Sequence, residues 1–392
     1  MNQNILELNL FGDGIHDDTD GIQALLDSGS SEVVVLAPES AYLISKALKI
    51  HSGQTLRMAP TTRIILADDA NCAMIENDCF SSFSENICID GGIWDMNNTE
   101  QEPNPYHFPG KDGKTMYDRL GFCREKHGNG AFSTLSAFPD VYTGFCMRFC
   151  RVRNFTLKNL TFRNPVTYGV QLGFVENFTV RDITFDYNSC NPKFWNMDGV
   201  HIEGGCKNGV VSNLKGACHD DLVAITADDS LYGPIENIVV DGIFAEQCHS
   251  AVRLLSHGIP VKNIQIRNVF GSYYTYCIGI TKYHGGPEER GVMQNISIEN
   301  ICAASSEGTK DVKGGRYPFI WIQSGVDVDG LRVENVFREE KTYPTPLFRL
   351  DQSATVRRLI LKNITQKNLL DPPAAFIELS GCAENPIISE CE

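Results

Sequence analysis

The sequence predicts an all-β protein, folded as a parallel β-helix in which the strands of successive coils stack along one axis. The first observation is a short phrase that recurs at intervals of 23 to 35 residues from Val152 onward. Its clearest copies are VRNFTLKN (152–159), VENFTVRD (175–182), IENIVVDG (235–242), VKNIQIRN (261–268) and MQNISIEN (293–300). A period in this range is typical of stacked repeat architectures, so one small unit is expected to repeat along the chain.

The second observation is a series of short apolar strands, one after each copy of the phrase. They read YGVQL, DGVHI, DLVAI, SAVRL, CIGI, FIWI, LFRL and FIEL, and the last ends near Leu379. Alternating apolar residues bounded by Gly, Asn, Asp and Ser indicate half-buried strands. No helical period long enough for a crossover separates them, which argues against βαβ units. Each strand is therefore expected to pair with its counterpart in the next coil, about 4.8 Å away.

Asparagine occupies the third place of most copies of the phrase. Its side chain hydrogen-bonds local backbone and tolerates left-handed dihedrals, so this place is expected to be a turn. Stacking of the coils would also align these side chains in a ladder.

The N-terminal segment is expected to cover the open end of the coil, which would otherwise expose core and unpaired strand edges. Asp17, Asp18 and Thr19 resemble the N-cap of an amphipathic helix, and Gly29 is expected to end it. Residues 1–50 are thus interpreted as a capping helix with the first strands. No Pro/Gly/Ser-rich linker interrupts the repeats, so residues 1–392 are predicted to form a single domain.

Composition limits the partners of the chain. The formal net charge of −15 argues against nucleic acid, because phosphates need a basic face. No apolar run of membrane-spanning length occurs, and the first residues lack the pattern of a secretory signal, so a cytoplasmic location is expected. The 14 cysteines lack metal-ligand spacing and are interpreted as small buried hydrophobes; no metal or cofactor is predicted. The sequence leaves the oligomeric state open.

The densest polar cluster lies on two successive coils, NMDGVHI (196–202) and HDDLVAI (219–225). Aligning DGVHI with DLVAI places Asp198 and Asp221 in one column, with Asp220 one position earlier. Three carboxylates so close repel one another, so at least one is expected to hold its proton near neutral pH. Such a group suits general acid and base catalysis at a glycosidic bond. A Ca²⁺ site or solvated turn acids are the alternatives.

Two segments resemble known families. GDGIHDDTDGIQ (12–23), with the following strand, is similar to the start of the pectate-lyase-like β-helix superfamily, which implies a right-handed, single-stranded coil. NMDG…HDDLVAI resembles the NTDG…DDCVAI pair of polygalacturonase-type enzymes, glycoside hydrolase family 28. That resemblance implies cleavage with inversion, Asp220 as general acid, and Asp198 and Asp221 as the residues that activate water. Inverting enzymes usually separate their carboxyl groups by about 6.5–9.5 Å, more than one coil spacing.

Two further motifs of that family match less closely. A Gly-His-Gly is expected one coil later, where this chain has His249 beside Ser250. The family's Arg-Ile-Lys grips a substrate carboxylate, but Gly279 occupies its Arg column and Lys282 is the nearest lysine. Arg253 stands in the Arg column one coil earlier and could supply a bidentate contact. Galacturonate specificity therefore does not follow from the resemblance.

Other outward residues extend the candidate cleft. Asn196 and His201 flank Asp198, and Trp321 could stack a sugar ring or pack in the core. Further candidates on this face are Gln171, Trp195, Arg349 and Glu378. The stretch 95–143 interrupts the repeat, and an insertion of this length in a compact domain is often functional. It is predicted to fold over the cleft and to close one end.

The resulting hypothesis is an exo-acting, inverting glycoside hydrolase for uronic-acid-containing, pectin-type or related plant saccharides. One alternative is a polysaccharide lyase or uronate epimerase, whose base could be His249, Arg253 or Lys282. The other is a non-catalytic, carbohydrate-binding β-helix.

Overall fold

The computed structural model describes residues 10–110, 113–115, 118, 142–189, 195–283, 286, 288–309 and 312–392. Its contacts divide the chain into two compact units. The N-terminal unit comprises Met1–Gln171 and Val175–Met197, and the C-terminal unit comprises Leu172–Phe174 and Asp198–Glu392. A single domain over residues 1–392 stays a prediction.

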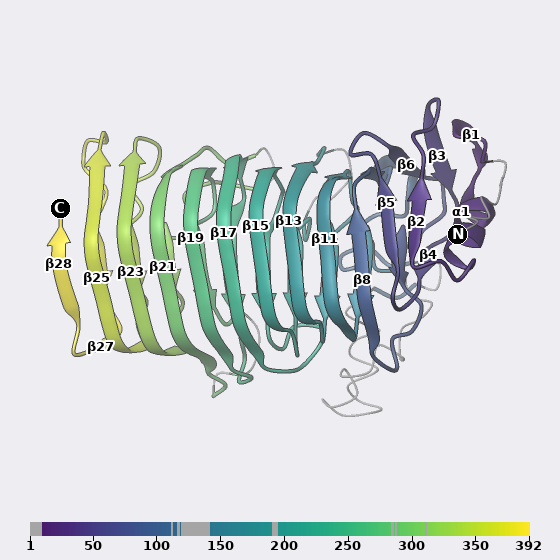
Figure 1. The fold of residues 1–392 in the computed structure, drawn as a ribbon. Helices are drawn as coiled ribbons and strands as arrows, with labels where there is room; N and C mark the ends of the chain where they lie inside the picture. Colours follow the sequence, from purple (N-terminus) through teal and green to yellow (C-terminus); the bar gives the residue numbers. More distant parts are fainter. Residues whose placement is uncertain are drawn as a thin grey trace. The chain divides into compact units, whose positions relative to one another are not determined.

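The fold is a right-handed parallel β-helix, as predicted. In the C-terminal unit each coil contributes one long and one short strand, and the long strands lie side by side (Figure 1). The long strands are β15 (Lys207–Ala217), β17 (Ile235–Cys248), β19 (Val261–Tyr273), β21 (Gly291–Ser305), β23 (Val326–Glu340) and β25 (Thr355–Asn368). The short strands are β14 (Val200–Glu203), β16 (Asp221–Thr226), β18 (Ser250–Leu255), β20 (Ile278–Thr281), β22 (Ile320–Ile322), β24 (Phe348–Leu350) and β26 (Ile377–Leu379). The unit ends with β27 (Cys382–Glu384) and β28 (Ile387–Cys391).

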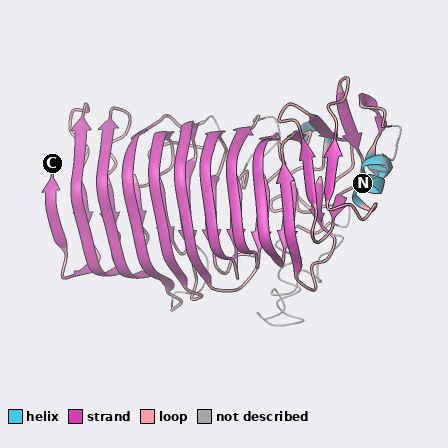
Figure 2. Cartoon of the chain, viewed as in Figure 1, coloured by secondary structure: helices cyan, strands magenta, loops and turns pink. Residues whose placement is uncertain are grey.

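Near the start of the N-terminal unit, after strand β1 (Asp13–Asp17), lies the capping helix α1 (Thr19–Leu26), shown in cyan in Figure 2. Ile22 and Leu26 on its inner face are fully buried. Asp18 is the N-cap residue, but its carboxylate accepts hydrogen bonds from the Phe11 and Gly12 amides outside the helix. Asp17 instead accepts from the Thr19 amide at 2.9 Å, so the predicted acidic cap is divided between two residues.

Parallel strands make up most of the rest of this unit, and all of them except β1 follow α1 in the chain. They are β1 (Asp13–Asp17), β2 (Glu32–Val35), β3 (Ala41–Ile44), β4 (Leu48–Ile50), β5 (Thr55–Met58), β6 (Arg63–Leu66), β7 (Ile75–Asn77), β8 (Ser84–Asp90), β9 (Ile93–Asp95), β10 (Met147–Cys150), β11 (Val152–Arg163), β12 (Val170–Gly173) and β13 (Glu176–Asp186), with a 3-10 turn at Asn98–Glu100. Most of the stretch 95–143 lies outside the described residues, so its position over a cleft stays a prediction.

The recurring phrase forms the long strands, and its asparagines form ladders, which confirms both expectations. In the C-terminal unit the Asn237 amide donates to Asn208, the Asn263 amide to Asn237 and the Asn295 amide to Asn263, at 2.8–3.0 Å. These four residues have φ between 53° and 61°, the left-handed region that asparagine tolerates. In the next coil Gly330 of β23 occupies this position, because Gln294 pairs with Asp329 and Ile296 pairs with Leu331. Glycine has no side chain to continue the ladder, so the ladder ends there.

The short strands are buried almost throughout and supply much of the core. β14, β16, β18 and β20 pair residue for residue, which aligns their inward Val, Ile and Leu side chains. Cysteines 146, 150, 206, 218, 248 and 277 are buried as expected, whereas Cys302 and Cys382 are exposed. Among the described residues, no helix is long and apolar enough to cross a membrane.

Candidate active site

The predicted acidic residues lie on adjacent coils of the C-terminal unit. His201 pairs with Ala224, and the Gly199 amide donates to the Asp221 carbonyl at 3.0 Å. Asp198 and Asp221 therefore occupy the same column, as the sequence alignment predicted. Asp221 is the first residue of β16 and Asp220 precedes it, so the two carboxylates leave the chain in different directions.

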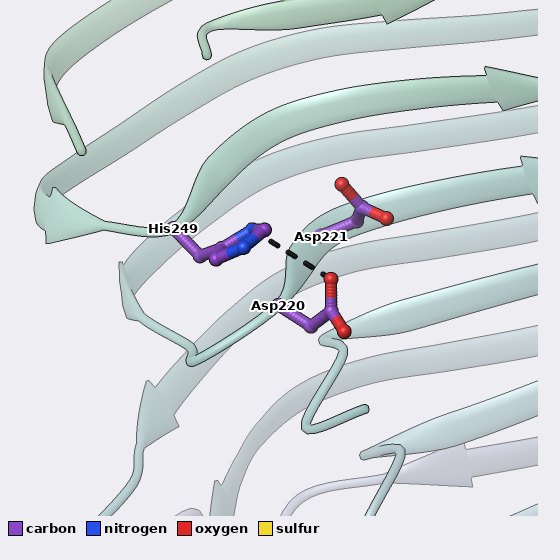
Figure 3. Close-up of side chains that lie close together, drawn as sticks. All are labelled: Asp220, Asp221 and His249. Carbon is purple, nitrogen blue, oxygen red and sulfur yellow. Dashed lines mark ion pairs between the residues drawn. The ribbon is translucent and has the colours of Figure 1, made fainter. Parts of the chain in front are cut away.

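Asp220 and His249 lie beside each other, and the ion pair between them is drawn in Figure 3. The His249 Nδ1 lies 3.6 Å from an Asp220 carboxylate oxygen, and the two side chains are 16% and 20% exposed. One ligand atom from each of Asp220, Asp221 and His249 lies within 4.8 Å of the others. The one-residue offset of His249 from the family pattern thus does not remove it from the acids.

Asp221 is fully buried and held by three side chains from the next two coils. Its Oδ1 accepts hydrogen bonds from the Ser250 hydroxyl and, at 3.0 Å, from the Tyr276 hydroxyl. Its Oδ2 lies 2.8 Å from the Arg253 Nε. A buried carboxylate is costly unless polar partners surround it, and these three supply that compensation.

A glycine makes room for one of these partners. A Cβ added at Gly279 would lie 2.8 Å from Cε2 of Tyr276. The Tyr276 ring therefore packs against bare backbone at residue 279, and from there its hydroxyl reaches Asp221. The resemblance implies an arginine at position 279. Gly279 of β20 pairs with Arg253 of β18, so the two residues occupy the same column on adjacent coils.

Asp198 and His201 form a buried pair. The His201 Nδ1 lies 2.5 Å from an Asp198 carboxylate oxygen, and its Nε2 lies 3.0 Å from the Thr226 hydroxyl. Burial, with the nearby charges of Asp220 and Asp221, raises the pKa of Asp198 well above its usual range. Burial lowers the pKa of His201 to about 3. Both shifts favour a proton on Asp198 over a proton on His201, in the arrangement where a neutral Asp198 donates to a neutral imidazole. The expectation that one of the three acids holds its proton near neutral pH stays a prediction.

Arg253 and Trp321 lie in the predicted column but face other partners. Besides its contact with Asp221, the Arg253 guanidinium lies 5.8 Å from the Tyr283 ring centre. Trp321 is 4% exposed, stacks on Tyr317 at 4.4 Å and donates from Nε1 to Asp351 at 2.8 Å. Its packing role therefore accounts for the residue. Tyr283 is 37% exposed and offers a ring on which a sugar could stack, but it was not among the residues predicted from the sequence. The sequence signal for it was its position just after a strand that ends near the site.

Two predicted residues have described contacts elsewhere. The Lys282 ammonium donates to the Gly286 carbonyl at 2.6 Å, and its backbone amide donates to Gln323. Asn196 belongs to the N-terminal unit, where its side-chain oxygen lies 2.9 Å from the His107 Nε2. Their roles toward substrate stay predictions.

The donor atoms of Asp220, Asp221 and His249 lie close enough together to hold a cation. Calcium prefers an all-oxygen shell, whereas this cluster offers an imidazole and two carboxylates. The Arg253 guanidinium already contacts Asp221, so a cation bound by Asp221 would lie next to this positive charge and be repelled by it. The described residues therefore fit acid–base chemistry better than a resident calcium ion.

No family model and no curated protein matches the sequence. The structure is similar to a family 28 exopolygalacturonase from Yersinia enterocolitica, with a TM-score of 0.63 and 16% identity over 97% of this chain and 77% of that chain. It is also similar to the A-module of a mannuronan C-5 epimerase from Azotobacter vinelandii, with a TM-score of 0.56 and 13% identity over 98% and 97%. A surface protein and adhesin of Streptococcus pneumoniae has a TM-score of 0.55 and 13% identity over 97% and 98%. At these identities the likeness shows the fold, which enzymes and an adhesin share.

Proposed function

We propose that this protein is a glycoside hydrolase that cleaves uronic-acid-containing or related plant saccharides. The supporting observation is the contrast among the three acids on two adjacent coils. Asp220 reaches solvent beside His249, Asp221 is buried among donors and a guanidinium, and Asp198 is buried with its proton. Carboxyl groups whose environments favour different protonation states are the arrangement that acid–base hydrolysis needs.

In the proposed reaction Asp220 is the general acid and Asp221 the general base. Asp220 donates its proton to the glycosidic oxygen as the bond from that oxygen to the anomeric carbon breaks. Asp221 takes a proton from a water molecule, whose oxygen bonds to the anomeric carbon from the opposite face, so the configuration inverts.

The role proposed for Asp198 differs from the one that the resemblance implied. A protonated acid cannot accept a proton from water, and Asp198 already donates to His201. Asp198 is therefore proposed as a neutral positioning residue that separates the site from the buried imidazole, with Asp221 alone as base.

The substrate is proposed to be held differently from galacturonate in family 28. Gly279 replaces the expected arginine, and the Arg253 guanidinium lies on Asp221 rather than free toward a substrate carboxylate. Tyr283 offers an exposed ring beside this guanidinium, on which a sugar could stack. Action at chain ends, with the insertion 95–143 closing the cleft, and a cytoplasmic location complete the proposal; rapid loss of viscosity of a long polymer would contradict the first of these.

The test is a panel of pectic and hemicellulosic oligosaccharides, with products separated by chromatography. Asp220→Asn is expected to lower kcat on the responsive substrate by about 100-fold or more, the usual contribution of a general acid. Asp241→Asn is the matched control, because Asp241 is a partly exposed carboxylate on β17 that pairs with Arg267. Equal activity of Asp220→Asn and wild type would exclude the mechanism, and the anomer of fresh product, read by NMR, would test inversion.

An epimerase or lyase is the second candidate, favoured by the contact between His249 and Asp220 and by the likeness to the mannuronan epimerase fold. Elimination leaves an unsaturated sugar that absorbs ultraviolet light, whereas hydrolysis does not. A chain that binds saccharide but yields neither product, and whose binding tolerates Asp220→Asn, would instead be a non-catalytic binding protein.

A further inference from the structure

A groove of about 780 Å³ runs across the outer face of the long strands, on the sheet that does not carry the candidate active site. Its lining comes from five successive coils, β17, β19, β21, β23 and β25, which lie side by side in Figure 1. Four coil spacings of about 4.8 Å make the groove roughly 19 Å long.

The floor of the groove repeats polar groups at the coil spacing. Gln265, Ser297 and Arg332 are paired in register across β19, β21 and β23, and they face outward beside the asparagine ladder. A ligand that lies along the groove would meet amide, hydroxyl and guanidinium groups in turn. It would also meet the Glu299 carboxylate, which accepts a hydrogen bond from the Ser297 hydroxyl. Among the described lining residues none is aromatic, whereas the centres of protein interfaces are enriched in aromatic residues.

At Gly330 the asparagine ladder lacks a side chain, and this leaves a small open space in the groove. A Cβ added there would lie 3.2 Å from both the Asn295 Oδ1 and the Arg358 Nη2. The guanidinium of Arg358 and the last ladder carbonyl therefore border the same small space. Arg358 also contacts Asp329 at 2.9 Å, and Arg332 contacts Glu334. One carboxylate engages at most two of the five donors of a guanidinium, so donors remain for a ligand.

We propose that this groove binds a carboxylate-bearing oligosaccharide as a second site, remote in sequence and sheet from Asp220. A chain with a net charge of −15 needs local cations to hold an anionic ligand, and the groove lining has two arginines, Arg332 and Arg358, against one carboxylate, Glu299. The inference rests on the proposed function for its ligand class. Its role would be to retain acidic polymer at the surface while the other sheet performs the reaction.

Calorimetric titration with an oligogalacturonate tests the site, using the Asp220→Asn protein so that no turnover occurs. Two binding events are expected, and Gly330→Asn should remove one by filling the space with a ladder side chain. Arg332→Ala should weaken that event roughly tenfold, as expected for a hydrogen bond to a charged group. Arg267→Ala is the matched control, because Arg267 has a similar exposed ion pair, with Asp241, but does not line the groove.

The outcomes separate this proposal from the preceding one. A single event that Gly330→Asn removes and Arg332→Ala weakens supports the groove even where no hydrolysis is found. Binding that both variants leave unchanged overturns the groove, whatever the hydrolysis assay gives. Equal binding of a neutral oligosaccharide of the same length would overturn the requirement for carboxylates.

Discussion

The buried pair of Asp198 and His201 predicts an unusual dependence of stability on pH. We predict that at pH values between about 4 and 6.5 the folded pair holds one proton, on Asp198, because burial raises the pKa of Asp198 and lowers that of His201 to about 3. The unfolded pair also holds one proton in this window, but on His201, because the unperturbed values are 3.8 and 6.5. Since stability changes with pH only where the two states bind different numbers of protons, the pair contributes no slope.

Outside this window the same count gives two slopes. Above about pH 6.5 the unfolded His201 loses its proton while the folded Asp198 keeps its own, so the pair's contribution to stability falls as the pH rises. Below about pH 4 the unfolded pair binds two protons and the folded pair one, so the contribution falls as the pH decreases toward 3.

Two substitutions separate the members of the pair. In Asp198→Asn the folded protein holds no proton at this site while the unfolded His201 holds one below pH 6.5, so stability should rise with pH by up to about 1.4 kcal/mol per unit. In His201→Gln the folded Asp198 holds a proton that the unfolded one has lost above pH 3.8, so the slope should have the opposite sign. Urea unfolding at half-unit steps from pH 4.5 to 6.5 measures both differences from wild type, at pH values within the window set by the two unperturbed values. Differences that stay constant with pH in both variants would refute the assignment of protons.

Three further predictions concern the residues around Asp221 and the ladder. Tyr276→Phe removes a hydroxyl that donates to Asp221 and should lower kcat/KM by roughly tenfold or more. Tyr274→Phe is the control and should have little effect, because the Tyr274 hydroxyl has no hydrogen-bond partner among the described residues. Equal effects of the two variants in steady-state kinetics would contradict this. Gly279→Ala should resemble Tyr276→Phe in activity, because the added Cβ displaces the ring, and adding Tyr276→Phe to it should cause little further loss. Asn263→Ala removes one donor and one acceptor of the ladder and replaces a residue at φ 55°, so the free energy of unfolding, measured by thermal denaturation, should fall by about 1–3 kcal/mol. Gln265→Ala, at an exposed position of the same strand, is the control, and an equal fall in that variant would argue against the ladder.

The repeats made much of the fold predictable. Period and alternation determine which residues stack, so the column of Asp198 and Asp221, the place of Gly279 and the asparagine ladder all followed from alignment of coils. These features depend on neighbours one coil away, whose register the hydrophobic pattern fixes.

The partners of the site residues were less predictable, because they depend on turns between the strands. Tyr276 precedes β20, and nothing in its local pattern indicates that its hydroxyl reaches back to Asp221. Lys282 follows the same strand, and the turn there directs its ammonium to Gly286. The sequence left open whether Trp321 stacks a sugar or packs inside the protein. In the structure its ring stacks on Tyr317 and its indole N–H donates to Asp351, so it packs inside the protein. Exposure of a side chain at the end of a strand is set by loop conformation, which periodicity does not encode.

The bare backbone at residue 279 also restricts how such a scaffold can change its preferred sugar during evolution. An arginine there would restore a cation facing the reaction centre, yet its Cβ alone would collide with the neighbouring ring at 276. Acquisition of a galacturonate-type clamp therefore requires two coordinated replacements, and a lineage with only the first would lose the support of its catalytic base. Among natural variants, we expect a large residue at 279 to accompany a small one at 276.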